Sequence, residues 1–232
     1  MINEFSRTEM LIGTEGMNKL KNSTVVLFGV GGVGSHAAEA LARCGVGRLI
    51  LVDNDTVSLT NINRQSIALH STMGQFKTRV MKEKIADICP GTQVITFEEF
   101  VLPDNIESLF EHMELQMGQG NSVDYILDAI DTVTAKLALA GFAASHGIPV
   151  IASMGTGNKL HPELLRISDI SRTSVCPLCK VMRKELKARN ISGLKVCWSP
   201  EQPLSPDRRQ RIQGAAAPLP EAYLLCRLWQ DL

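Results

Sequence analysis

The sequence predicts an α/β protein of the Rossmann-like, doubly wound type, with a mostly parallel sheet and a smaller C-terminal extension. Three observations carry this prediction. Short apolar runs typical of strands alternate with helix-like segments of ten to fifteen residues. A glycine-rich turn joins the first such strand to its helix. The second apolar run ends in an acidic residue.

The glycine turn organises the chain. Residues 24–34 read TVVLFGVGGVG, and Gly29, Gly31 and Gly34 fit the pattern G-x-G-x-x-G between a strand and a helix. The first glycine permits the tight turn, the second lets a pyrophosphate approach the backbone, and the third lets the helix pack on the strand. Free N–H groups at the helix start would then face an anion.

Asp53 completes this pattern. It follows the apolar run 49–52, at ~20 residues after the glycines, which is the usual spacing for an acid that binds a ribose hydroxyl. The alternative is a strand–turn–helix without a ligand. Because strand, helix and acid are all in place, the sequence favours nucleotide binding.

Composition limits the functional classes. The chain has 232 residues, 44% hydrophobic and 21% charged, with a formal net charge of zero. This is enough for one sizeable core with an appended subdomain. A nucleic acid would need a local basic patch, since the whole-protein field is neutral. No run is long enough for a membrane span and no signal-peptide layout is present, so we expect a cytoplasmic protein with no membrane contact.

Cysteine spacing gives one possible metal motif. Of six cysteines, only Cys176 and Cys179 are spaced as metal ligands, whereas a structural zinc site needs four. The remaining candidates belong to no second pair; they are Cys197, Cys226, His146 and His161. We therefore expect no zinc at this pair.

The first half of the chain predicts several elements around the turn. Residues 1–22 are helix-like, with breaks at Gly13 and Gly16. Residues 54–65 form a polar loop rich in amides, ending in Asn63, Arg64 and Gln65. Such a loop suits a polyphosphate, although an ordinary capped turn is the alternative. A helix follows over 74–88, with Lys77 near its start, which is unfavourable for the helix dipole unless an anion shares the site.

The remaining elements continue the alternation and then depart from it. We expect strands over 94–97, 125–131, 149–155, 164–170 and 195–199, and helices over 103–117, 133–145, 177–190 and 222–232, with a mobile loop over 200–220. The helix over 177–190 is strongly basic and is the best local patch for phosphates. Its cations are Lys180, Arg183, Lys184, Lys187 and Arg189.

The loop 60–65, placed after the glycine turn and Asp53-Asn54-Asp55, resembles a known superfamily. The chain is similar, from Phe5 to about Ser199, to the adenylyltransferases related to ubiquitin-activating enzymes, which include molybdopterin- and thiamine-biosynthesis enzymes. Within them it most resembles the tRNA threonylcarbamoyladenosine dehydratase branch. Four segments carry that likeness, at residues 5–13, 38–43, 170–173 and 181–186.

The resemblance implies ATP and Mg²⁺ as cofactors and one adenylyltransferase-type domain over 1–232. That domain would comprise an N-terminal arm (1–22), a nucleotide-binding core (23–157) and a substrate-side region (158–232). The implied catalytic residues are Arg7, Arg64, Lys77 and Asp131, with Asp131 binding magnesium and Arg7 reaching a partner's site in a homodimer. The implied nucleotide-binding residues are Gly29, Gly31, Gly32, Gly34, Asp53, Asp55, Asn61, Asn63, Arg64, Gln65 and Lys77.

The expected activity follows from the resemblance. The enzyme would adenylate the threonyl carboxylate of threonylcarbamoyladenosine in tRNA and drive cyclisation, with the basic patch contacting tRNA. The alternative is activation of a sulfur-carrier or ubiquitin-like protein, with a sulfur-transfer protein as a possible partner. An NAD-dependent oxidoreductase fits the glycines and Asp53 but not the loop, and a non-catalytic nucleotide-binding scaffold is a further alternative. The chain departs from the dehydratase pattern at Cys176, where Asp is usual, and after Gln213.

Overall fold

A computed structural model describes residues 2–205 of the chain and confirms the predicted α/β class. The chain divides into two compact units, Met1–Ile151 and Ala152–Leu232. The first unit contains the glycine turn and most of the helices. None of the helices within residues 2–205 is long and apolar enough to cross a membrane.

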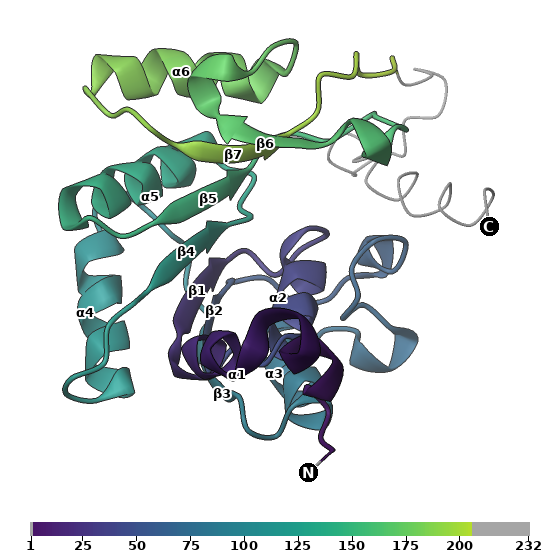
Figure 1. The fold of residues 1–232 in the computed structure, drawn as a ribbon. Helices are drawn as coiled ribbons and strands as arrows, with labels where there is room; N and C mark the ends of the chain where they lie inside the picture. The colour runs from purple at the N-terminus through teal and green to yellow at the C-terminus, as the bar shows by residue number, and fades with distance from the viewer. Residues whose placement is uncertain (1, 206–232) are drawn as a thin grey trace. The chain divides into compact units, whose positions relative to one another are not determined.

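The parallel strands of the first unit bring the ends of their apolar sequences to the same edge of the sheet. Its strands are β1 (Thr24–Phe28), β2 (Arg48–Val52), β3 (Gln93–Phe97), β4 (Tyr125–Asp128) and β5 (Val150–Ser153). Their order is β3-β2-β1-β4-β5, and β1 runs parallel to both β2 and β4 (Figure 1). Phe28 is in register with both Val52 and Asp128, so the segments that follow these three residues begin side by side.

Helices cover both faces of these strands. The helices are α1 (Ser6–Asn22), α2 (Gly34–Arg43), α3 (Lys77–Ile88), α4 (Ile106–Met117) and α5 (Val133–His146). Alternate residues of a strand point to opposite faces. Accordingly Phe28 packs in one core cluster with α4 and α5, whereas Leu27 packs in the other with α2 and α3. This is the doubly wound arrangement that the sequence predicts.

Several predicted boundaries differ from the structure. Gly13 interrupts α1 with a φ of 72°, as expected, but the helix continues through Gly16, so that predicted break is wrong. The third helix begins at Lys77 instead of residue 74, because Gly74 has a φ of 78° and Phe76 is extended. The fourth begins at Ile106 instead of 103, since the Asn105 carboxamide accepts the Leu102 N–H in a turn.

The second unit, as far as residue 205, is built on an antiparallel pair and one helix. The strands are β6 (Arg166–Asp169) and β7 (Lys195–Trp198), and α6 (Pro177–Ala188) lies between them in the chain. The strand predicted over 164–170 is shorter because 3-10 turns, η3 (Pro162–Leu164) and η4 (Ile170–Arg172), flank it. Two further 3-10 turns, η1 (Leu59–Asn61) and η2 (His70–Thr72), belong to the first unit. The predicted helix over 222–232, most of the predicted loop over 200–220, and Cys226 lie outside the described residues.

Candidate functional site

The glycine turn is folded so tightly that side chains are excluded from two of its positions. Gly29 has a φ of 87°, and a Cβ there would lie 2.7 Å from the Ala129 carbonyl oxygen. A Cβ on Gly34 would lie 1.7 Å from the Gly29 carbonyl oxygen. The start of α2 therefore rests directly on the end of β1, which is the close helix–strand approach expected of the third glycine.

Gly31 differs from these two glycines because space remains beside it. The nearest neighbour of a Cβ at Gly31 would be the Gln65 side-chain nitrogen, at 3.7 Å. Gln65 is 6% exposed, and its amide oxygen has no hydrogen-bond partner within residues 2–205. An open backbone position therefore lies next to a buried amide with unused hydrogen-bonding capacity, which suits a polar ligand.

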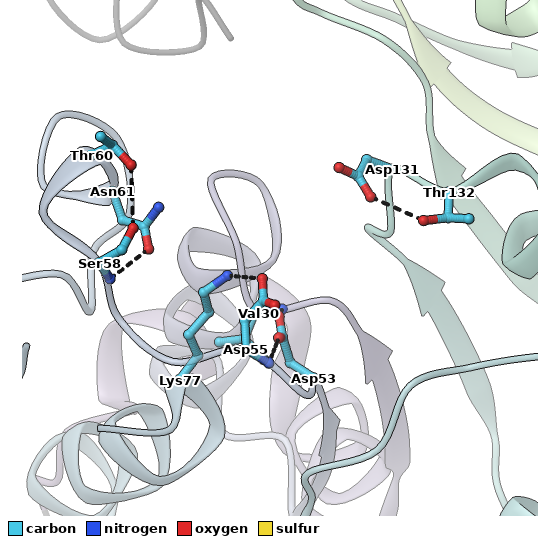
Figure 2. A network of polar contacts seen from close by, with 9 residues as sticks. All are labelled: Val30, Asp53, Asp55, Ser58, Thr60, Asn61, Lys77, Asp131 and Thr132. Carbon is cyan, nitrogen blue, oxygen red and sulfur yellow. Dashed lines mark hydrogen bonds and ion pairs between the residues drawn. The ribbon is translucent and has the colours of Figure 1, made fainter. Parts of the chain in front are cut away.

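The Asp53 carboxylate connects the glycine turn to the following loop. One oxygen accepts the Val30 N–H at 2.6 Å and the other accepts the Asp55 N–H at 2.8 Å (Figure 2). Burial raises the pKa of Asp53, while Lys77 and the two N–H donors oppose that rise. Each carboxylate oxygen has two lone pairs, so Asp53 can still accept a hydrogen bond from a ligand hydroxyl.

Lys77 occupies an unusual position, buried at the first turn of α3. Its ammonium lies 2.7 Å from the Asp55 carboxylate, and its backbone N–H donates to the Asp55 carbonyl at 3.1 Å. The Lys77 side chain is only 6% exposed, whereas that of Asp55 is 61% exposed. The anion that the sequence requires near this helix start is therefore Asp55, which solvent can reach.

The polar loop forms a capped turn and carries an arginine. The Asn61 side-chain oxygen accepts the Ser58 N–H at 3.0 Å, as expected of an ordinary capped turn. Arg64 donates to the Thr60 carbonyl at 2.9 Å and to the Asn63 side chain at 3.1 Å. The Ser35 hydroxyl accepts the Ser66 N–H at 3.1 Å, so the end of the loop is fixed to the start of α2. The capping role of Asn61 and a role of the loop in ligand binding are compatible.

Asp131 lies just beyond β4 and is exposed. Its carboxylate accepts the Thr132 hydroxyl at 3.3 Å, and Figure 2 shows it separate from the Asp55–Lys77 pair.

A buried ion pair supports this segment. Asp128 accepts the Lys136 ammonium at 3.0 Å and the Ile130 N–H at 3.1 Å, and both charged side chains are almost fully buried. Burial raises the pKa of Asp128, and Lys136 opposes that rise. Sequence reasoning missed this pair. Its signal was an acid at the end of a strand followed eight residues later by a lysine inside a helix.

The other predicted cations lie on α1 and α6. Arg7 is exposed on α1, and its side chain makes no ion pair with another residue of 2–205. On α6, Lys180, Lys184 and Lys187 are exposed, whereas Arg183 donates to the Thr173 backbone and side chain, and Arg189 pairs with Glu185 at 2.7 Å. The five cations predicted to form a basic patch therefore include only three exposed lysines that are free of such partners.

No metal cluster accompanies the cysteine pair in the part of the chain that the structure describes. Residues 2–205 hold no group of three or more His, Cys, Asp or Glu side chains that could bind an ion. Cys176 and Cys179 are both buried, at 2% and 0% exposure.

The chain is similar to a known protein family and to individual members of it. The family model described as "ThiF family" matches residues 5–193. A Bacillus subtilis tRNA threonylcarbamoyladenosine dehydratase is 46% identical over 205 residues, which is 88% of this chain and 77% of that protein. The Escherichia coli dehydratase is 37% identical, over 79% of this chain and 65% of that protein.

Solved structures of the E. coli dehydratase are also similar to this chain. A structure of the E. coli tRNA N6-threonylcarbamoyladenosine dehydratase in complex with ATP has a TM-score of 0.79 at 33% identity, over 88% of this chain and 83% of that one. A structure of that protein with AMP has a TM-score of 0.81 at 31% identity, over 98% and 91% of the two chains.

We predict that Gly34→Ala destabilises the protein by about 3 kcal/mol or more, because the new Cβ would overlap the Gly29 carbonyl oxygen and force α2 away from β1. Urea unfolding followed by circular dichroism measures this. Gly91→Ala is the matched control, since nothing lies within 4 Å of a Cβ there. Equal unfolding midpoints for the two variants would contradict the close approach described above.

Proposed function

The chain belongs to the ThiF family, and we propose that it is an ATP-dependent dehydratase acting on threonylcarbamoyladenosine in tRNA. The observation that carries the proposal is the 46% identity to the Bacillus dehydratase over 88% of this chain. The site's geometry supports it, because the buried Lys77 and the open position at Gly31 suit a nucleotide's phosphates and the Asp53 carboxylate suits its ribose.

The proposed reaction has two steps. An oxygen of the threonyl carboxylate attacks the α-phosphorus of ATP, and the bond to the β-phosphate breaks with loss of pyrophosphate. The carbamoyl oxygen of the same modification then attacks the activated carbonyl carbon, and AMP leaves as the ring closes. The substrate supplies its own nucleophile, so the enzyme's main tasks are to position both groups and to stabilise negative charge.

Residues of the first unit divide these tasks. The phosphates would lie against the glycine turn, where Gly31 leaves room and the first N–H groups of α2 favour an anion. Asp53 would accept a ribose hydroxyl. Lys77 and Arg64 would stabilise the charge that builds on the phosphates, with Asp55 holding the Lys77 ammonium in position before ATP arrives.

Magnesium fits the donor set at Asp131. Its carboxylate is exposed and, among residues 2–205, accepts one long hydrogen bond, from Thr132, so hard oxygen donors remain for a cation. When bound, Mg²⁺ neutralises phosphate charge and acts as a Lewis acid. The Asp128–Lys136 pair would hold the segment that carries Asp131.

We predict that Lys77→Ala lowers the rate of ATP-dependent cyclisation on the order of 10³-fold, because a cation that stabilises phosphoryl-transfer charge is lost. AMP and pyrophosphate release are measured with tRNA carrying threonylcarbamoyladenosine, and the nucleoside product is identified by mass spectrometry. Lys82→Ala, an exposed lysine on the same helix, should retain full activity. Wild-type turnover with a carrier protein but not with tRNA would exclude the dehydratase and favour the carrier-activating alternative.

We further propose that the exposed lysines of α6 contact tRNA phosphates. Replacing Lys184 and Lys187 with Glu should weaken tRNA binding and flatten the dependence of log affinity on log salt concentration, by roughly one unit of slope per lost phosphate contact. Filter binding over a salt series measures both quantities. Lys82→Glu controls for the effect of charge reversal elsewhere. A slope equal to that of the wild type would remove α6 from the tRNA interface.

The dimer is also a proposal. α1 exposes three large apolar side chains, Met10 at 86%, Leu11 at 87% and Ile12 at 45%, close to the exposed Arg7. Apolar side chains clustered on a surface are typical of an interface. A second copy of this chain would cover them and bring Arg7 to the partner's nucleotide site.

A mixing experiment tests whether Arg7 acts across the dimer. Arg7→Ala and Lys77→Ala chains are each expected to be inactive alone. Co-refolded in equal amounts, half of the dimers are mixed, and one site in each mixed dimer has both residues intact, so about a quarter of the wild-type activity should return. Absence of recovery, with mixed dimers confirmed by affinity tags, would place Arg7 in its own subunit's site or outside catalysis.

A further inference from the structure

The second unit contains a chemical feature that the proposed function does not use. Cys176 is the residue that precedes the first turn of α6, Pro177 opens the helix, and Cys179 lies one turn later. This is the position of the cysteine pair in dithiol redox sites, where the helix N-terminus favours a thiolate on the first cysteine. The two cysteines are close enough that each thiol shifts the pKa of the other.

A buried lysine provides a countercharge for that thiolate. Lys159 is 2% exposed, and its ammonium donates to the neutral Ser199 carbonyl at 2.7 Å. It forms no ion pair with a carboxylate within residues 2–205, and its charge acts on Cys176. An ammonium held in the interior without an anion is costly, and a thiolate at Cys176 would offset that cost.

The surrounding charges favour ionisation of one cysteine over the other. The hydrogen bond from Cys179, together with Lys159, lowers the pKa of Cys176 to about 5. The same hydrogen bond raises the pKa of Cys179, against which the Thr173 side chain and the charge of Arg183 act only weakly. The two opposite directions favour ionisation of Cys176 over that of Cys179. Cys197 differs, because burial alone raises its pKa.

The backbone before Cys176 is also held in a rare conformation. Val175, a β-branched residue, has a φ of 64°, and the Cys176 N–H donates to the Ser174 carbonyl two residues earlier. Such strain persists only where surrounding structure enforces it. Here it turns the chain so that Cys176 precedes α6 with its sulfur 3.7 Å from the Gly155 carbonyl oxygen.

We propose that Cys176 and Cys179 form a redox-active dithiol, which a small peroxide oxidises to a disulfide within α6. The Cys176 thiolate attacks one oxygen of hydrogen peroxide, the O–O bond breaks, and hydroxide leaves and takes up a proton to become water. Cys179 then attacks the sulfenic sulfur of Cys176, and the S–O bond breaks with release of a second water. The two sulfurs together lose two electrons, which reduce the peroxide. Both thiols are buried, so the oxidant must be about the size of water.

The test uses the full chain, purified without chelator and reduced, then treated with hydrogen peroxide. Free thiols are capped, and the peptides are analysed by mass spectrometry without reduction. We expect a Cys176–Cys179 disulfide that dithiothreitol reverses, while Cys197 in the same molecules stays capped as a free thiol. In Cys179→Ser, the sulfenic acid at Cys176 should persist and be trapped by dimedone. Cys197→Ser is the matched control and should oxidise as the wild type does.

The pH profile separates this site from an ordinary buried thiol. An ordinary thiol has a pKa of about 8.5, so its oxidation rate rises about tenfold per pH unit below that value. For the Cys176–Cys179 disulfide we expect a rate that changes less than about twofold between about pH 6.5 and 8, since the thiolate of Cys176 is already formed. Three results would each overturn the proposal. The first is a disulfide-formation rate that rises tenfold per pH unit, and the second is free thiols at Cys176 and Cys179 after peroxide treatment of the folded protein. The third is one zinc per chain that is released only when both thiols are modified.

Discussion

The geometry of the candidate site depends on a single carboxylate, that of Asp53. Asp53 directly follows β2, and its two oxygens accept N–H groups from the glycine turn and from the start of the next loop. The glycine turn, 23 residues before Asp53 in the chain, is thereby held against the loop that follows β2 at one edge of the sheet. Burial disfavours the ionised form, which is why the two N–H donors and the nearby Lys77 are needed to hold it. The same residue is the predicted ribose ligand, so under the proposed function the group that holds the site together would also bind the nucleotide.

Two lysine–aspartate pairs near the strand ends differ in the solvent exposure of the aspartate, and this difference suits one pair to a structural role and the other to the proposed ligand-binding role. Lys136 and Asp128 exclude water almost completely, and neither charge can leave the other without a large desolvation cost. Lys77 is just as buried, but its partner Asp55 is mostly exposed. Water can replace Lys77 around Asp55 at small cost, so a phosphate can take over the ammonium. The first pair fixes the segment before Asp131, and under the proposed function the second would keep a cation available for ATP.

The sequence predicted the parts of this site that local backbone chemistry determines. The glycine spacing, Asp53 and the placement of Lys77 at a helix start were visible because each follows from a strand, a turn or a helix dipole. The pairing of Lys77 with Asp55 was not visible, since it joins residues 22 positions apart through the sheet edge. For the same reason the Asp128–Lys136 pair was missed. Gly16 was predicted to break α1, but a single glycine inside a helix costs only about 1 kcal/mol and the surrounding residues continue it.

The helix α6 shows why counting charges along a sequence overstates a binding surface. Its five cations look equivalent in the sequence, yet Arg183 faces Thr173 and Arg189 is paired with Glu185. Arginine suits these contacts within the chain because its planar guanidinium donates in several directions at once, whereas lysine has a compact and strongly hydrated ammonium. The three lysines are exposed, so under the proposed function their charge would be available to tRNA phosphates. The contacts of Arg183 with Thr173, in turn, fix the turn that leads to Cys176, so the inward face of α6 holds the dithiol while its outward face remains basic.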